Sequence, residues 1–330
     1  MFVYCVRRVL SSLLVLLASS FLVFVMAAAT MDPLQSLRQR QGLAAGAIDA
    51  QAHLLGLDKP APARYWTWLT GVAHGDFGKN LAGNPINPDL FHRVIVTGRL
   101  VLAAMILATV LAVIVGVLTA VRQHKLSDYV STTISYVLIS LPVFWFATLL
   151  KQFLVIWGNQ HIFGGNHILW TAGETQPGLE LYGTSREILI DRIEHMILPT
   201  ISLAALNFAA WSRFQRASML DVMNADYMRL ARAKGIPYGR VLVRHGLRNA
   251  LIPVTTVIAL NVGLILGGAV LTEKVFVWNG MGVYLTDNAL GQQDVNVLLA
   301  WLMVSAFFVI AANLVADLFY AVLDPRIRLS

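Results

Sequence analysis

The densest group of charged side chains in the chain lies between residues 213 and 249. This segment carries eight Lys/Arg and two Asp/Glu. A catalytic centre needs positioned acids, bases or nucleophiles, whereas a segment dominated by cations binds an anionic surface or an acidic partner. We therefore expect recognition rather than catalysis from this basic segment. Its eight cations are Arg213, Arg216, Arg229, Arg232, Lys234, Arg240, Arg244 and Arg248.

A short helix is predicted within the basic segment, over residues 225–234. Asn224 can cap its start, and Asp226 complements the positive end of the helix dipole. Gly235 suits the left-handed position that follows a helix, and Pro237 prevents continuation. These residues predict a helix that ends in a sharp turn.

One face of this predicted helix is apolar, because Tyr227, Leu230 and Ala231 follow the spacing i, i+3, i+4. Its last turn is basic, with Arg232 and Lys234. A helix this short and charged cannot span a membrane, so it must lie on a surface. That surface is either the anionic inner leaflet or a cytoplasmic partner, which the small Ala231 would allow to approach closely. The residues alone leave both interpretations open.

Other kinds of chemistry have little support. The chain has no GxxxxGK[ST] loop to hold ATP phosphates, and its single cysteine, Cys5, excludes an intramolecular disulfide and a cysteine-based metal cluster. His161 and His167 are two isolated histidines in a loop. A membrane enzyme would need clustered titratable groups, and Asp317 is the one clear candidate. We predict no catalytic residue, no metal site and no cofactor.

Composition places the chain in a membrane. Apolar residues make up 57% of the sequence, charged residues 13%, and the mean hydropathy is +0.65. Soluble domains carry about 25% charged residues. The net charge of +7 is therefore not a sign of nucleic-acid binding, and we expect an all-α integral membrane protein.

Six segments approach the length of about 20 residues that a spanning helix needs. The fourth is short and would require snorkelling or local thinning of the bilayer. Pro142 interrupts the third, where the hydroxyl of Ser140 can satisfy a freed carbonyl. The first follows Arg7 and Arg8 and could instead be a cleavable signal peptide, although its apolar run is long for one. The six segments are 9–29, 100–121, 129–150, 196–211, 250–271 and 297–316.

The distribution of cations predicts that both termini are cytoplasmic. With six spans, the loops on the side of the termini carry 14 Lys/Arg and 4 Asp/Glu, and the opposite loops carry 9 and 13. Cytoplasmic loops are the ones enriched in Lys/Arg. In the long outer loop, 31–97, Trp66 and Trp68 are predicted to anchor the chain at the membrane interface.

Few polar residues inside the spans could line a path for a solute. The candidates are Asn207, Trp211 and Asn261, which carry polar or amphipathic side chains. Hydrogen bonding between helices is the alternative role for each.

Two stretches of the basic segment, 226–235 (DYMRLARAKG) and 244–253 (RHGLRNALIP), resemble the cytoplasmic coupling loop of ABC-importer permeases. The resemblance is greatest to the oligopeptide/dipeptide branch, whose members are inner-membrane components of binding-protein-dependent transport systems. Two positions differ from the family pattern: Arg229 stands where an acidic residue is usual, and Asn279 where a proline usually precedes Gly-x-Gly. The other matching motifs run along nearly the whole chain: LGLDKP at 55–60, GDFG at 75–78, SLPVF at 140–144, ILP at 197–199, MLDV at 219–222 and LDPRIRL at 323–329.

This resemblance implies a type I ABC-importer transmembrane fold in a multi-pass protein of the bacterial cell membrane. Residues 1–93 would hold the first helix and the outer loop, 94–323 the permease core with its coupling loop at 213–249, and 324–330 a cytoplasmic tail. The implied partners are a second homologous permease, two ABC ATPase subunits or one fused ATPase, an extracytoplasmic peptide-binding protein and the lipid bilayer.

The resemblance also implies that the short helix docks into a cleft of the ATPase. Its contact residues would be Tyr227, Arg229, Leu230, Ala231, Arg232, Lys234 and Gly235. The implied cargo is an oligopeptide or dipeptide, with nickel, glutathione or another peptide-like solute as alternatives. A secondary transporter is a further alternative, but it would favour an internal repeat, which the sequence does not show.

Overall fold

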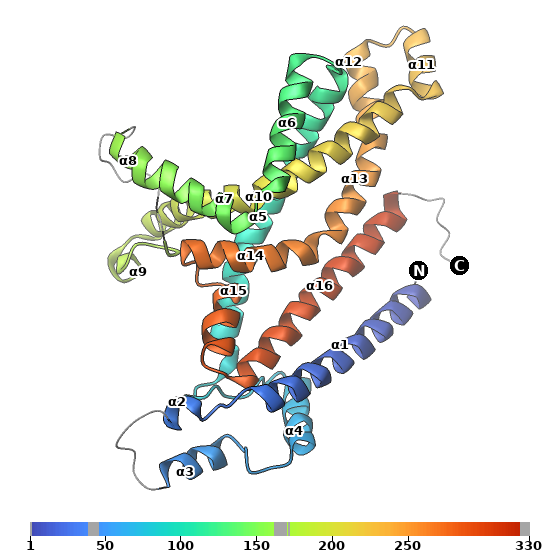
Figure 1. Ribbon diagram of the computed structural model, residues 1–330. Coiled ribbons are helices and arrows are strands. Elements are labelled where there is room, and N and C mark those ends of the chain that lie inside the picture. The colour runs from blue at the N-terminus through green and yellow to red at the C-terminus, as the bar shows by residue number, and fades with distance from the viewer. Residues whose placement is uncertain (1, 39–45, 162–169, 171, 324–330) are drawn as a thin grey trace. The chain divides into compact units, whose positions relative to one another are not determined.

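Helices form almost all of the regular structure. The computed structural model describes residues 2–38, 46–161, 170 and 172–323, and within these ranges it has no strand, only an isolated bridge between Lys79 and Pro85. The chain divides into two compact units, whose helices carry their labels in Figure 1. Unit 1 comprises Met1–Thr97 and Asn279–Ala311, and unit 2 comprises Gly98–Trp278 and Ala312–Ser330.

Unit 1 is built around the contact between its first and fourth helices. The hydroxyls of Ser20 and Tyr65 lie 2.8 Å apart, and Phe24 and Ala27 pack with Tyr65 and Trp68 in a buried cluster. The first helix is thus part of the core of unit 1, and its retention in the mature protein stays a prediction. The helices of unit 1 are α1 (Phe2–Thr30), α2 (Gln35–Arg38), α3 (Ala47–Leu54), α4 (Ala61–Ala73), the start of α5 (Ile86–Val121), α15 (Met281–Val283), a π-helical segment (Tyr284–Leu290) and most of α16 (Val295–Leu323).

Unit 2 is organised around the long helix α10 (Ser185–Met223), which packs against α6, α7, α13 and α14. Close approach between helices is visible at Gly116 of α5, where an added Cβ would lie 2.6 Å from Cβ of Gln215. Small residues allow such approach in membrane helices. The other helices of unit 2 are α6 (Leu126–Ser140), α7 (Val143–Leu150), α8 (Gly158–His161), α9 (Leu179–Tyr182), α11 (Asp226–Ala233), α12 (Tyr238–Val241), α13 (Arg248–Leu260) and α14 (Val262–Phe276), with π-helical segments at Lys151–Trp157 and Leu242–Leu247.

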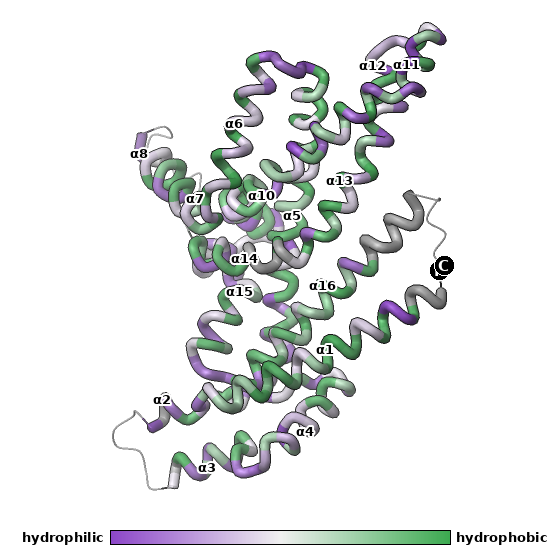
Figure 2. Tube along the Cα trace, turned by 45° about the vertical axis from the view of Figure 1, so that its right-hand side comes forward, coloured by the Kyte–Doolittle hydropathy of each residue, from purple (hydrophilic) through white to green (hydrophobic). Residues whose placement is uncertain are grey.

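Four helices among the described residues are long and apolar enough to cross a membrane, and a bent pair gives a fifth. The four lie in α1, α5, α10 and α16, and apolar residues run along much of α1 (Figure 2). The count of six spans and the cytoplasmic location of both termini stay predictions.

The bent pair is the third predicted segment. Its two parts, Leu126–Ser140 and Val143–Trp157, meet at an angle of 109°, so Pro142 breaks the helix instead of kinking one straight span. The hydroxyl of Ser140 donates to the carbonyl of Val137 at 2.8 Å. The carbonyl that Pro142 frees is that of Leu138, four residues earlier, and it accepts instead from the Leu141 N–H at 3.3 Å. The expected role of the Ser140 hydroxyl is therefore not observed.

Two other predicted segments differ from expectation. The fourth lies within a longer helix, α10, which extends from Ser185 to Met223 and is one of the span candidates; snorkelling or local thinning around its short apolar run stays a prediction. The fifth is divided at Asn261 into α13 and α14, and neither helix reaches a spanning length. Asn261 interrupts the helix because its side chain competes for backbone groups: Nδ2 donates to the carbonyl of Val257 at 2.9 Å.

The outer loop is held by the turns that its glycines allow. Gly75 and Gly78 have φ of 82° and 89°, and the carboxylate of Asp76 accepts from the Gly78 N–H at 2.9 Å. The two tryptophans of this loop have different environments. Trp66 is 65% exposed, as an interfacial residue would be, but Trp68 is buried in the core of unit 1. The prediction of an interfacial Trp68 was wrong, because α4 turns that side chain toward α1.

Candidate functional site

The candidate site is the short helix α11 and its surroundings in unit 2, where hydrophilic residues gather (Figure 2). α11 begins at Asp226, and its N-cap is Ala225 without a side-chain cap. Asn224 instead ends the preceding helix α10. The predicted cap at Asn224 was wrong because α10 continues through Met223, which leaves Asn224 in a helical conformation.

The end of α11 agrees with the sequence-based prediction. Lys234 is the C-cap, and Gly235 follows with φ of 76°. The Gly235 N–H donates to the carbonyl of Arg232 at 2.9 Å, and no atom lies within 4 Å of an added Cβ. A β-carbon at Gly235 would therefore be disfavoured by backbone conformation alone, not by crowding.

The inner face of α11 packs against its own chain. Met228 and Ala231 are buried and form a cluster with Val241 of α12. A Cβ added at Gly246 would lie 3.2 Å from Cε of Met228, so this glycine lets the segment after α12 approach α11. Ala231 therefore serves packing within the chain and does not lie on the free face that was predicted for it.

The outer face of α11 carries two exposed apolar side chains. Tyr227 is 41% exposed and Leu230 is 58% exposed. Arg229 forms an ion pair with Asp226 on the same helix, and the guanidinium of Arg232 lies 4.9 Å from the centre of the Tyr238 ring. The face combines apolar contact surface with cations whose positions are restrained by local partners.

An ion pair that sequence reasoning missed ties the end of α10 to α6. The guanidinium of Arg216 donates two hydrogen bonds to the buried carboxylate of Asp128, at 2.7 and 2.8 Å. Bidentate pairs of this kind fix geometry as well as charge. Nearby, Arg213 lies over the ring of Tyr136 at 4.2 Å. Arg213 and Arg216 therefore have structural roles. The sequence around these two residues gave no local signal of their partners, which lie far away in the chain.

The hydrogen bonds of Asn207 and Asn261, two of the three candidates for the solute path, do not link the candidates to one another. Asn207 and Asn261 are partly exposed, and each donates to a carbonyl in its own helix, Leu203 and Val257, at 2.8 and 2.9 Å. Trp211 is fully buried inside the chain.

The residues considered for metal or acid–base chemistry are dispersed. No group of three His, Cys, Asp or Glu suitable for a metal occurs among the residues that were described. A ring nitrogen of His161 hydrogen-bonds the carbonyl of Trp157 at 3.0 Å. His167, the side chain of Asp317 and the tail at 324–330 lie outside the described residues.

Comparison with known proteins gives two family matches that together cover most of the chain. The family described as "Binding-protein-dependent transport system inner membrane component" matches residues 112–329. The family described as "Binding-prot-dependent transport system membrane comp, N-term" matches residues 1–88.

Individual proteins are similar over nearly the full length. The chain is 40% identical to the oligopeptide transport system permease protein OppB of Mycobacterium tuberculosis (strain H37Rv), over 99% of each chain. It is 37% identical to the oligopeptide transport system permease protein AppB of Bacillus subtilis, over 98% of this chain and 99% of the relative. It is 38% identical to the dipeptide transport system permease protein DppB of Escherichia coli K12, over 83% of each.

Proposed function

Since the chain belongs to the family of binding-protein-dependent transport system inner membrane components, we propose that it forms half of the translocation pathway of an ATP-driven peptide importer. It is a multi-pass protein of the bacterial inner membrane with the type I ABC-importer fold. The observation that carries the proposal is the similarity over nearly the whole chain to permeases named for oligopeptide and dipeptide transport.

The proposed partners follow from this role. A second homologous permease would complete the path, two ABC ATPase subunits or one fused ATPase would supply the energy, and an extracytoplasmic protein would deliver the peptide. The chain itself lacks a phosphate-binding GxxxxGK[ST] loop. ATP hydrolysis is therefore assigned to the partners.

We assign the contact with the ATPase to the outer face of α11. Tyr227 and Leu230 supply exposed apolar surface, and Arg229, Arg232 and Lys234 supply charge. Gly235 and Ala231 serve this contact indirectly: Gly235 ends the helix, and Ala231 fastens it to α12. A helix held in this way can transmit a displacement caused by the ATPase to α10 and α13.

For the path, the partly exposed Asn207 and Asn261 remain the proposed lining residues. Their amides can pair with peptide groups without reading side chains. Trp211 has no exposed surface in this conformation, so we place it in the packing around α10 and not on the path.

The proposed function is tested by reconstituting the chain with its partner subunits in proteoliposomes. Uptake of labelled peptide is expected to need ATP and the extracytoplasmic binding protein, and the isolated chain is expected to show no hydrolysis. Uptake of nickel or glutathione in place of peptide would point to the alternative cargo. Sustained hydrolysis by the isolated chain, after removal of contaminating ATPases, would contradict the assignment.

Topology gives a separate prediction, tested by cysteine labelling after Cys5→Ser removes the native thiol. An impermeant maleimide added from outside is expected to label Leu181→Cys and not Gly239→Cys. Leu181 is 83% exposed, so a cysteine at this position is accessible to the reagent. The opposite labelling pattern would overturn the orientation with both termini inside.

A further inference from the structure

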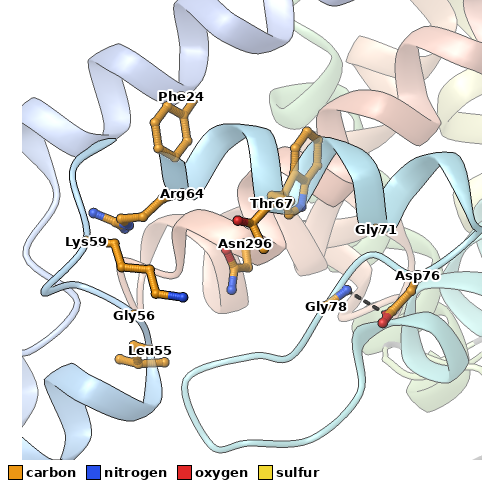
Figure 3. A pocket seen from close by; sticks show the side chains of 11 residues that line it. Phe24, Leu55, Gly56, Lys59, Arg64, Thr67, Gly71, Asp76, Gly78 and Asn296 are labelled. Carbon is orange, nitrogen blue, oxygen red and sulfur yellow. Dashed lines mark hydrogen bonds between the residues drawn. The ribbon is translucent and has the colours of Figure 1, made fainter. Parts of the chain in front are cut away.

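Unit 1 contains a cavity of about 280 Å³ between α1, α4 and the loop that carries Asp76 (Figure 3). Phe24 of α1 forms one wall, Arg64, Thr67 and Trp68 of α4 form another, and Lys59 and Asn296 complete it. This volume is at the lower end of the range for small-molecule sites. The cavity can hold a headgroup-sized fragment, but not a whole peptide.

Two cations line this cavity without an acidic partner in the described part of the chain. Lys59 extends across the opening toward Asn296, while Arg64 lies on the side of Phe24 (Figure 3). The guanidinium of Arg64 is 5.8 Å from the centre of the Phe24 ring. Burial lowers the pKa of Arg64, which means that this cation has lost water without gaining a carboxylate. A bound anion would compensate the partly desolvated Arg64, and the exposed Lys59 at the opening of the cavity would add a second positive charge.

The lining also has one neutral hydrogen-bond donor that lacks a partner among the described residues. The indole Nε1 of Trp68 is buried and has no hydrogen-bond partner. The hydroxyl of Thr67 already donates its proton to the carbonyl of Ala63 at 2.9 Å, so it adds no donor for an anion. Asp76 is the one carboxylate of the lining, and its Oδ1 is already engaged by the Gly78 N–H.

The position of Phe24 sets the depth of the cavity in the membrane. Phe24 lies in the membrane-spanning part of α1, six residues before the helix ends at Thr30, or about 9 Å along the axis. Its neighbours Leu22, Val25 and Met26 are exposed, as lipid-facing residues would be. A cavity with one wall on a span and the others on a loop lies near the membrane surface, where lipid phosphates are found.

We propose that this cavity binds the phosphate of an anionic phospholipid headgroup, held by Lys59 and Arg64. The proposal goes beyond peptide transport and does not depend on the cargo. The acyl chains would extend along the exposed face of α1, and the headgroup would fill the space between α1 and α4. The net charge of the lining favours an anionic headgroup over a zwitterionic one.

Native mass spectrometry of the purified transporter, incubated with equal amounts of phosphatidylglycerol and phosphatidylethanolamine, tests the proposal. The wild-type protein is expected to retain phosphatidylglycerol preferentially. Lys59→Gln and Arg64→Gln are each expected to weaken that retention about fivefold, because a cation near a lipid surface contributes roughly that factor. Lys79→Gln is the matched control, since Lys79 is exposed on the same loop and does not line the cavity; it should retain the lipid as the wild type does.

Three results would overturn the proposal. Equal retention of the two lipids by the wild type would remove the anionic preference. Displacement of the lipid by millimolar inorganic phosphate would assign the site to a free anion. Unchanged lipid retention in both cavity variants, with weaker association of the extracytoplasmic binding protein, would make the cavity a protein contact. Circular dichroism of each variant shows whether it is folded, so that loss of the lipid is not confused with loss of structure.

Discussion

Replacing Gly235 with valine is expected to reduce ATP-driven peptide uptake by about 5- to 30-fold while the chain still reaches the membrane. Gly235 has φ of 76°, and an L-residue in the left-handed region costs roughly 1–2 kcal/mol, which corresponds to that change in population. A β-branched residue is a particularly poor fit there. The end of α11 would move, and the helix would no longer present its outer face at a fixed angle.

The chain offers a matched control four residues away. Gly239 is exposed, has no atom within 4 Å of an added Cβ, and has no positive φ. Gly239→Val should therefore leave uptake close to the wild-type rate, and Gly235→Asn, which tolerates the left-handed conformation, should retain most of it. The measurements are uptake in proteoliposomes and the amount of inserted protein. Equal uptake by the two valine variants would refute a role for the positive φ.

Replacing Leu230 with aspartate is expected to weaken association with the ATPase about 10- to 100-fold. Leu230 is 58% exposed on the outer face of α11, and burying a leucine in a partner contributes about 1.5–3 kcal/mol. Because the side chain has little contact with its own chain, insertion and folding should be unaffected. Co-purification of the ATPase in detergent solution measures the effect.

The same experiment separates docking from lipid binding. If α11 merely rests on lipid in the membrane, Leu230→Asp would not change ATPase association in detergent, where no bilayer is present. Leu181→Asp is the control, because Leu181 is more exposed than Leu230 but lies in α9 on the predicted outer side. Normal ATPase association and normal uptake in Leu230→Asp would favour the lipid-surface interpretation of the basic segment.

A bulky substitution at Ala231 does not test the docking face. The sequence predicted that the small side chain of Ala231 would let a partner approach α11 closely. Since Ala231 packs against Met228 and Val241, Ala231→Trp would instead force α11 away from α12. It would disturb coupling by breaking contacts within the chain, so it cannot test the docking face directly.

Sequence reasoning succeeded where a property depends on neighbouring residues or on composition. Low charge and long apolar runs require a lipid environment whatever the packing, and helices among the described residues are the result. The end of α11 was predictable because the left-handed turn at Gly235 and the stop at Pro237 are local effects. The motifs that resemble peptide permeases were likewise readable without a structure.

Properties that depend on distant residues could not be read in this way. Whether Ala231 or Leu230 faces inward depends on the surface that α12 presents. The partner of Arg216 is Asp128, 88 residues away, and Trp68 is buried because α1 covers it. Periodicity shows that a helix has an apolar face, but the burial of each side chain depends on which element packs there, and that is a consequence of the tertiary arrangement.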